Sequence, residues 1–223
     1  MAIRAVILDY GMVISNAAVP AAHERMVAVS GLSRETLDRG YWANRHSYDL
    51  GMTGPEFWQK VASDAGASFS SEQIDGLIES DIMMWTSLNE EMLAWIADLQ
   101  NAGFRTAILS NMVPEILGYM RQEFDWLAQF HHHTWSCELG IGKPDPAIYL
   151  HTCEKLDVLP AEALFVDDKI ENVAGAERSG LQAIQFSSVE QLRKELIARG
   201  LEDHLPIPGT ALPIPGTAVE PRP

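Results

Sequence analysis

Residues 5–16 read A-V-I-L-D-Y-G-M-V-I-S-N, and the expected fold can be worked out from this stretch. The run Ala5–Leu8 is apolar without alternation, which is typical of a strand buried on both faces of a parallel sheet. Asp9 follows this run directly, and Gly11 stands two positions further on. A carboxylate at the end of such a strand is expected at the carboxyl edge of the sheet, where open α/β folds bind their ligands.

Similar apolar runs recur along the chain. The predicted strands are Ala5–Leu8, Thr106–Leu109, Ala163–Val166 and Gln182–Phe186, with a weaker one at His132–Cys137. Helix signals separate them: Asn89 precedes two acids, Asp145-Pro146 has the pattern of a cap with a first-turn proline, and Ser187 with Glu190 has the spacing of a capping box. Strands that alternate with helices predict an α/β fold with a doubly wound, Rossmann-like parallel sheet.

Between the first two strands the sequence shows helix signals alone. Thr53 with Glu56 and Ser70 with Gln73 have the spacing of capping boxes. An insertion at this point emerges at the carboxyl edge of the sheet, where it could act as a lid. We therefore expect a core of residues 1–16 and 88–200, a small helical cap of residues 17–87, and a C-terminal tail of residues 201–223.

The tail contains an exact repeat. Leu205–Ala211 reads L-P-I-P-G-T-A, and Leu212–Ala218 has the same seven letters. Proline at this density excludes helix and favours extended backbone. The composition favours a flexible tail. The alternative is that the tail docks on its own or a neighbouring subunit, which would allow a homo-oligomer.

Charge and composition exclude several classes of partner. Lysine and arginine number 16 against 31 acids, and the net charge is -15, so the chain repels nucleic-acid backbones and anionic lipid surfaces. No apolar run approaches the ~20 residues of a membrane helix. The two cysteines and the lack of a secretory leader favour the cytoplasm. A small anionic substrate stays compatible with this charge, because a divalent metal can reverse the field inside one pocket.

Polar side chains follow the predicted strands at their carboxyl ends, which converge on one crevice in a parallel sheet. They are Asp9 after the first strand, Ser110 and Asn111 after the second, and Asp167 and Asp168 after the strand at 163–166. Lys143 stands apart from them, in the loop G-I-G-K-P-D-P just before a helix. Carboxylates brought together resist ionisation unless a cation is present. Oxygen ligands of this kind indicate a hard divalent metal, Mg²⁺.

Four segments in this order and spacing resemble the motifs of the haloacid dehalogenase superfamily of hydrolases. They are D-Y-G-M-V at 9–13, L-S-N at 109–111, K-P-D-P at 143–146 and V-D-D-K-I-E-N at 166–172. The resemblance runs from about residue 3 to residue 200. The helical insertion resembles the small cap of that family. The pattern D-x-G-x-V with such a cap also resembles a branch that includes α-glucose-1-phosphate phosphatases and the phosphatase domains attached to epoxide hydrolases.

The resemblance implies a role for each of these residues in hydrolysing a small phosphorylated metabolite. Asp9 would attack phosphorus and form an aspartyl-phosphate, which divides one hard hydrolysis into two easier steps. The Asp9 carboxylate, the Gly11 carbonyl and Asp168 would bind Mg²⁺, with Asp167 helping directly or through water.

Further roles follow from the same resemblance. Ser110 and the backbone amide of Asn111 would donate hydrogen bonds to phosphoryl oxygens. Lys143 would neutralise charge that develops in the transition state. Asn172 would support the loop of the fourth motif.

One position departs from the family pattern. Phosphatases of this family commonly carry a second aspartate two residues after the nucleophile, and here Gly11 stands there. Loss of a general acid or base typically costs about 10²- to 10⁴-fold in rate. Either the enzyme is slow, or the acid comes from elsewhere, or the leaving group needs little help, as with an anomeric sugar phosphate or an acyl phosphate. We favour a sugar phosphate as substrate.

The cap offers candidates for the missing acid and for sugar stacking. The proton donors considered are His23, His46, Tyr48 and Asp49, and the stacking residues are Trp42, Trp58 and Trp85, although each also fits a plain place on a helix surface, in a loop or in the cap core. The run His131–His133 is interpreted as structural, because neighbours on a strand point to opposite faces.

Two alternatives remain open. A 2-haloacid dehalogenase would use the same aspartate to displace halide from carbon without magnesium, but members with that activity usually lack the paired acids of the fourth motif, and Asp167-Asp168 argues against it. A non-catalytic phosphate-binding protein would explain Gly11 and the repeated tail.

Overall fold

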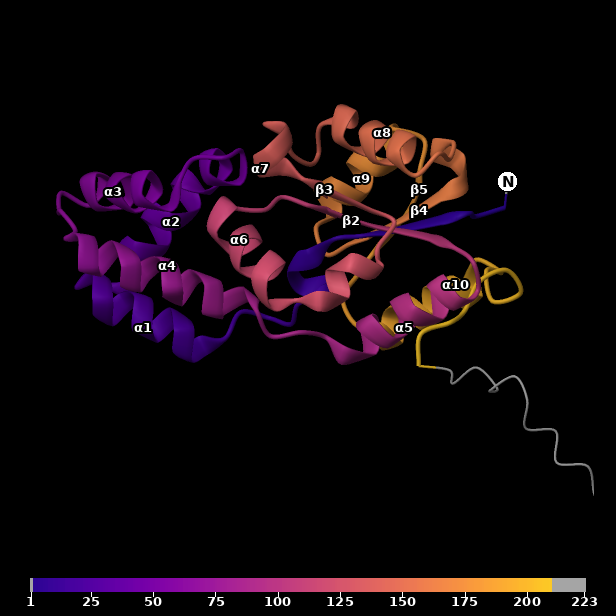
Figure 1. Ribbon diagram of the computed structural model, residues 1–223, viewed down its shortest axis with the longest axis horizontal. Helices are drawn as coiled ribbons and strands as arrows, with labels where there is room; N and C mark the ends of the chain where they lie inside the picture. Colours follow the sequence, from indigo (N-terminus) through magenta and orange to yellow (C-terminus); the bar gives the residue numbers. More distant parts are fainter. Residues whose placement is uncertain (1, 210–223) are drawn as a thin grey trace, which may run out of the picture.

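In the computed structural model, which describes residues 2–209, five parallel strands form one sheet in the order β3-β2-β1-β4-β5 (Figure 1). The strands are β1 (Ala5–Leu8), β2 (Arg105–Ser110), β3 (His132–Trp135), β4 (Ala163–Asp167) and β5 (Gln182–Gln185). Strand β1 lies at the centre, with Leu8 in register with Ile108 on one side and Val166 on the other. The predicted parallel α/β sheet is confirmed, and the strand limits differ by at most two residues.

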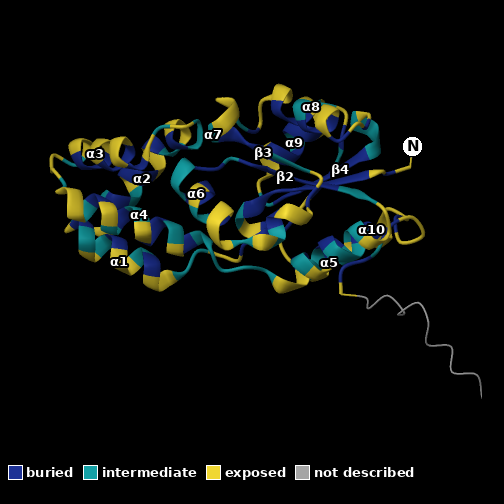
Figure 2. Cartoon of the chain, in the orientation of Figure 1, coloured by how far each residue is buried: buried dark blue, intermediate teal, exposed yellow. Residues whose placement is uncertain are grey.

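Helices cover both faces of the sheet, because alternate residues of each strand face opposite sides. Val6 and Leu8 point to the face that holds α5 (Glu90–Asn101) and α10 (Val189–Ala198). Ala5 and Ile7 point to the face that holds α8 (Pro146–Lys155) and α9 (Ile170–Arg178). The strands are therefore buried from both sides, as the dark blue ribbon of Figure 2 shows. Two further helices are α6 (Pro114–Glu123) and α7 (Ser136–Leu139).

The segment between β1 and β2 forms a separate group of helices at one end of the molecule (Figure 1). These are α1 (Pro20–Ser30), α2 (Arg34–Asp49), α3 (Gly54–Asp64) and α4 (Ser71–Trp85), and α5 follows on the core side. The predicted capping boxes are present: the Thr53 N–H donates to Glu56 at 3.0 Å, and the Ser70 N–H donates to Gln73 at 3.0 Å. Within residues 2–209, no helix has the length and apolar character needed to cross a membrane.

The two connections between the sheet and these helices run side by side. The Asn16 N–H donates to the Ser87 carbonyl at 2.7 Å, and the Asn89 N–H donates to the Ile14 carbonyl at 2.8 Å. The backbone is thus paired where the chain leaves the sheet and where it returns. We propose that this pairing marks the boundary between a core and a cap of residues 17–87.

The start of α10 differs from the prediction by one residue. Ser188, not Ser187, caps this helix, and its hydroxyl accepts a hydrogen bond from the Gln191 N–H at 3.1 Å. The Ser187 N–H instead donates to the side chain of Gln191 at 3.2 Å. Both serines have a polar residue three positions later, so spacing alone could not choose between them.

The beginning of the tail is docked on the core. Leu205 and Ile207 are 4% and 8% exposed. The Trp95 indole N–H donates to the Pro206 carbonyl at 2.7 Å, and Arg193 Nε donates to the Pro208 carbonyl at 2.8 Å. The flexible-tail interpretation is therefore wrong for residues 201–209, and the docking is on the same chain. The second copy of the repeat, at 212–218, lies outside the described residues.

Candidate functional site

The site begins at the turn that follows β1. The Asp9 N–H donates to the Val166 carbonyl at 2.9 Å, which ties this residue to the neighbouring strand. The Tyr10 N–H donates to Asp9 Oδ1 at 2.7 Å. Met12 has a φ of 62°, so the chain turns sharply here and then continues toward the first connection. Asp9 is held at the carboxyl edge of the sheet with only 7% of its surface exposed.

Lys143 lies between the carboxylates of Asp9 and Asp167. Its Nζ is 2.8 Å from Asp9 Oδ1 and 2.6 Å from Asp167 Oδ2, and its side chain is 1% exposed. Asn111 positions the loop, because its Nδ2 donates to the Lys143 carbonyl at 2.9 Å and its Oδ1 accepts from the Lys143 N–H at 2.8 Å. A Cβ at Gly142 would lie 3.0 Å from Asn111 Oδ1, so glycine allows this close approach. The Asn111 side chain thus holds Lys143 in place.

Asp167 is fully buried, and hydrogen-bond donors contact both of its oxygens. Oδ1 accepts from the Lys169 N–H at 2.8 Å and from Asn172 Nδ2 at 3.0 Å, while Oδ2 faces Lys143. The carbonyl of Asn172 in turn accepts from the Tyr149 hydroxyl at 2.9 Å. The neighbouring Asp168 is only partly buried and lines the pocket described below.

Burial makes the carboxylates of this cluster hard to ionise. It raises the pKa of Asp9 to about 7; the Lys143 ammonium opposes this shift, and the Asp167 carboxylate adds to it. Burial and the charge on Asp167 also raise the pKa of Asp168. Burial alone would lower the pKa of Lys143, but Asp167 and Asp9 raise it above its ordinary value. The Lys143 ammonium contacts Asp9 and Asp167, and Asp168 still has a raised pKa although Lys169 and Lys143 oppose the shift, so the cluster favours a further cation.

The donor set fits a magnesium ion. One oxygen each of Asp9, Asp167 and Asp168 lies within 4.8 Å of the others. Carboxylate oxygens are the ligands that Mg²⁺ prefers, and a dication would offset the mutual repulsion that raises these pKa values. Since donors already contact both oxygens of Asp167, Asp9 and Asp168 are the carboxylates best able to bind the ion directly.

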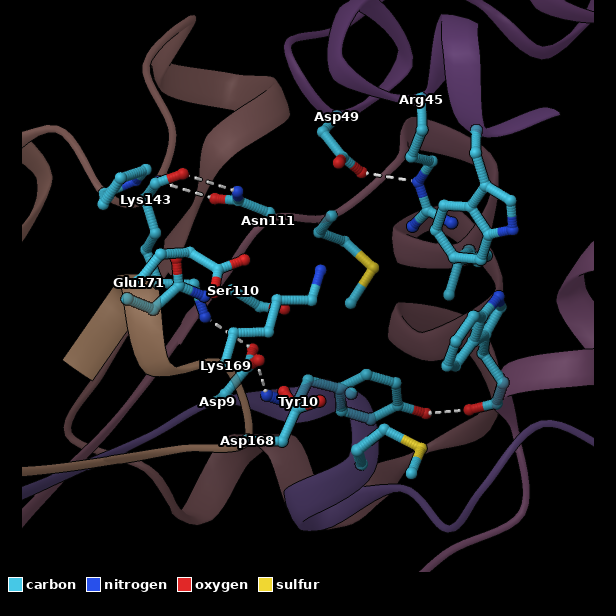
Figure 3. A pocket seen from close by; sticks show the side chains of 18 residues that line it. Asp9, Tyr10, Arg45, Asp49, Ser110, Asn111, Lys143, Asp168, Lys169 and Glu171 are labelled. Atoms are coloured by element: carbon cyan, nitrogen blue, oxygen red, sulfur yellow. Dashed lines mark hydrogen bonds and ion pairs between the residues drawn. The ribbon is translucent and has the colours of Figure 1, made fainter. Parts of the chain in front are cut away.

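Asp9, Lys143 and Asp168 line the floor of a cavity of about 350 Å³. The core wall also contains Ser110, 3% exposed, together with Lys169 and Glu171. Figure 3 shows Arg45 and Asp49 on the side of the pocket away from Asp9.

The far wall comes from α2 and the end of α4. Arg45 Nε lies 2.7 Å from Asp49 Oδ1, and the Arg45 guanidinium stands 5.9 Å from the centre of the Trp85 ring. Trp42 completes this wall and is 56% exposed. The pocket therefore has a charged floor and, opposite it, a far wall of aromatic and charged side chains.

The structure separates the cap candidates into two groups. Asp49, Trp42 and Trp85 line the pocket. The other candidates, which do not line it, are His23, His46, Tyr48 and Trp58. Tyr48 and Trp58 are fully buried in the cap core, and His23 Nε2 lies 2.6 Å from Asp38.

Sequence reasoning missed Arg45, Lys169 and Glu171. Arg45 could have been found from its spacing, because it stands four residues before Asp49 within the predicted helical insertion, and residues four apart share a face of a helix. Lys169 and Glu171 lie within the fourth motif, and their position next to Asp168 was the available signal.

The histidine run and the cysteines lie outside the pocket lining. His131 Nδ1 accepts from the Thr106 N–H at 3.1 Å, whereas His133 contacts the Leu127 carbonyl at 2.9 Å. The two rings thus make separate structural contacts. Cys137 and Cys153 are both free, and burial raises the pKa of each thiol to about 11.

Comparison with known proteins decides the family. The profile of the haloacid dehalogenase-like hydrolases matches residues 6–180. The chain belongs to this family. The resemblance seen in the four motifs is thereby confirmed, and the chain is a hydrolase of the haloacid dehalogenase type.

Individual relatives show the range within the family. Bifunctional epoxide hydrolase 2 of Rattus norvegicus is 29% identical over an alignment of 167 residues that covers 69% of this chain and 29% of that protein, so the chain spans less than a third of this relative. (S)-2-haloacid dehalogenase 1 of Pseudomonas sp. (strain CBS-3) is 27% identical over an alignment of 211 residues that covers 85% of this chain and 86% of the relative. A family enzyme from Bacteroides thetaiotaomicron, solved with magnesium and inorganic phosphate, is 17% identical, with a TM-score of 0.69 over 83% of this chain and 94% of that one. At this identity the likeness shows the fold alone.

Proposed function

We propose that this chain is a Mg²⁺-dependent phosphatase that hydrolyses a small phosphorylated metabolite through an aspartyl-phosphate on Asp9. The observation that carries the proposal is the buried cluster in which Lys143 bridges Asp9 and Asp167 while Asp168 stands beside them at the cavity floor. The family enzyme solved with magnesium and inorganic phosphate supports this assignment. The free cysteines support a reducing compartment, the cytoplasm, as its location.

Asp9 is oriented for attack on phosphorus. Its Oδ1 accepts a hydrogen bond from the Tyr10 N–H at 2.7 Å and forms an ion pair with Lys143 Nζ at 2.8 Å. Oδ2 is then the oxygen that forms the new bond to phosphorus while the bond to the leaving oxygen breaks. Water afterwards hydrolyses the aspartyl-phosphate and restores the carboxylate.

The residues around Asp9 stabilise the charge of the reacting phosphoryl group. Lys143 supplies a fixed positive charge in a buried setting, where it costs no reorganisation during reaction. Ser110 and the Asn111 backbone amide would donate hydrogen bonds to phosphoryl oxygens. Asp9, the Gly11 carbonyl and Asp168 would hold Mg²⁺, which supplies neutralisation of the substrate's charge when bound.

We assign Asp167 chiefly to holding Lys143. The carboxylate is fully buried, and Lys143, Lys169 and Asn172 contact its two oxygens. Any contact of Asp167 with the metal would pass through water. This assignment narrows the alternatives that the sequence left open.

The cap side of the pocket supports a sugar phosphate as substrate. Trp42 and Trp85 line this side of the pocket, and the apolar face of a sugar ring can pack against aromatic rings of this kind. Arg45 and Asp49 offer charged donors and acceptors for hydroxyl groups. Asp49 is held in an ion pair with Arg45 at 2.7 Å and lies on the side of the pocket away from Asp9, so it is not placed to serve as a proton donor there. A sugar phosphate that leaves from the anomeric carbon would reduce the need for such a donor.

One test separates this proposal from its alternatives. A panel of phosphorylated sugars is incubated with Mg²⁺, and release of inorganic phosphate is measured for the wild type, Asp9→Asn and a matched surface variant, Asp75→Asn. We expect release that a chelator abolishes, that Asp9→Asn abolishes, and that Asp75→Asn leaves unchanged.

A second candidate is a 2-haloacid dehalogenase, favoured by the similarity to the Pseudomonas enzyme over most of both chains. Release of chloride from 2-chloropropionate without metal, in place of phosphate release, would establish that activity and overturn the phosphatase. If neither phosphate nor chloride is released but the protein still binds phosphate, it would instead be a non-catalytic phosphate-binding protein.

A further inference from the structure

Residues 205–209, the described part of the first copy of the tail repeat, pack against α5 and α10, and we call the surface formed there by Trp95, Leu192 and Arg193 the groove. Leu205 and Ile207 belong to the same core cluster as Trp95 of α5 and Leu192 of α10. The docking face of the core lies on the side of the sheet that holds these two helices, as Figure 1 shows. This segment therefore packs against the core, in addition to following it in the sequence.

Side chains from both helices recognise the backbone of this segment. The Trp95 indole N–H donates to the Pro206 carbonyl at 2.7 Å, and Arg193 Nε donates to the Pro208 carbonyl at 2.8 Å. Prolines suit these positions, because a proline carbonyl accepts hydrogen bonds while the residue has no N–H to satisfy. Gly209 has a φ of 73°, and a Cβ there would collide with the Arg193 guanidinium. The groove therefore contacts five features of this segment: the carbonyls of Pro206 and Pro208, the side chains of Leu205 and Ile207, and Gly209.

The sequence of this segment recurs seven residues later. Leu212, Pro213, Ile214, Pro215 and Gly216 repeat the recognised pattern L-P-I-P-G in the same order. We propose that the groove between α5 and α10 is a binding site for this pattern, and that the second copy is an alternative ligand that seats in the groove of the same chain when the first copy leaves. The inference is independent of the proposed phosphatase.

The length of chain between Leu201 and each copy determines how often the second copy occupies the groove. Leu201 is buried and anchors the end of the core. Three residues separate it from Leu205, and ten separate it from Leu212. Because the two copies have identical sequences, they would make the same contacts in the groove. The two docked states then differ only in the entropy of closing the loop after Leu201, which makes docking of the second copy roughly sixfold less populated than docking of the first. A neighbouring chain competes poorly, because a short tether holds the second copy at an effective concentration of about a millimolar.

The experiment uses matched substitutions in the full-length chain. Ile207→Asp prevents docking of the first copy, Ile214→Asp prevents docking of the second, and the double variant prevents both. The readout is the indole N–H resonance of Trp95, assigned with Trp95→Phe, and its rate of hydrogen exchange with solvent. A merely structural role for the tail would not make this signal depend on the second copy.

We expect Ile214→Asp to leave the Trp95 indole protected as in the wild type. Ile207→Asp should lose roughly sixfold of that protection, because the second copy takes over. The double variant should lose it almost completely.

Equal loss in Ile207→Asp and in the double variant would overturn the proposal. Protection in Ile207→Asp that falls on dilution would place the second copy in the groove of another chain and would also overturn it. Gly209→Ala and Gly216→Ala form a milder matched pair, which keeps the test decisive if the aspartates disturb folding.

Discussion

Gly11→Asp should raise the rate of hydrolysis of simple alkyl phosphates. A Cβ at Gly11 would have no atom within 4 Å, and its φ of -63° and ψ of 131° are open to any residue. The added side chain therefore enters the pocket without a clash or backbone strain. It would supply the general acid that this chain lacks beside Asp9.

The magnitude follows from the chemistry of the leaving group. A positioned acid or base contributes about 10²- to 10⁴-fold in rate, which corresponds to about 3–5 kcal/mol of activation free energy. An alkyl leaving group needs the proton, so kcat/KM on an alkyl phosphate should rise within that range. A p-nitrophenolate leaves as a stable anion, so kcat/KM on p-nitrophenyl phosphate should change little.

The assay compares the wild type, Gly11→Asp and Gly11→Asn on both substrates with Mg²⁺ present. Asparagine has the size of aspartate but cannot donate or accept the proton, so it controls for steric and polar effects. If Gly11→Asp and Gly11→Asn behave alike on the alkyl ester, another group already transfers the proton, and the reasoning about Gly11 is refuted.

Three other perturbations test the cluster and the cap. Asp168→Asn should raise the Mg²⁺ concentration for half-maximal activity at least about tenfold, and an unchanged metal titration would remove Asp168 from the ligand set. Lys143→Met should abolish activity and lower the free energy of unfolding by about 3–5 kcal/mol, because it leaves two buried carboxylates without their cation. Urea unfolding with and without Mg²⁺ measures this loss of stability, and Mg²⁺ should restore part of it. Burial raises the pKa of Asp81 from 3.8 to about 6. The folded state therefore holds this proton more tightly than the unfolded state, and the associated stability, present below pH ~4, is lost as the pH rises through about 6. Asp81→Asn should consequently raise the free energy of unfolding by up to about 3 kcal/mol at pH ~8 and by little near pH ~4, and urea unfolding that shows equal destabilisation at both pH values would contradict this.

The core of the fold was predictable because its signals are local. Ala5–Leu8 and Ala163–Val166 are continuous apolar runs, and strands buried on both faces require such runs. The first-turn proline after Asp145 and the box of Ser70 with Gln73 identified helix starts correctly, because a cap is a contact between residues close in sequence. Where two serines had equivalent spacing, at the start of α10, the local signal was ambiguous and the prediction was wrong by one residue.

The convergence of Asp9 and Asp168 also followed from sequence, since parallel strands bring their carboxyl ends to one edge, whereas Lys143 lies in a loop and was expected beside them from the family resemblance. The roles proposed for these residues still await the assays above. The pairing of Arg45 with Asp49 and the clamp of Asn111 on the Lys143 loop could not be derived this way. They depend on how a helix group and a loop are oriented against the sheet.

The amino-acid sequence by itself determined the parallel sheet, the helical insertion after Asp9 and the set of polar residues at the strand ends, because periodicity, caps and connection order are written in neighbouring residues. Only the tertiary structure decided which cap side chains face Asp9, that Asp167 has donors on both oxygens, and that the first L-P-I-P-G segment docks against Trp95 and Arg193. Those outcomes are contacts between segments far apart along the chain, and their geometry is set by packing, which no local pattern encodes.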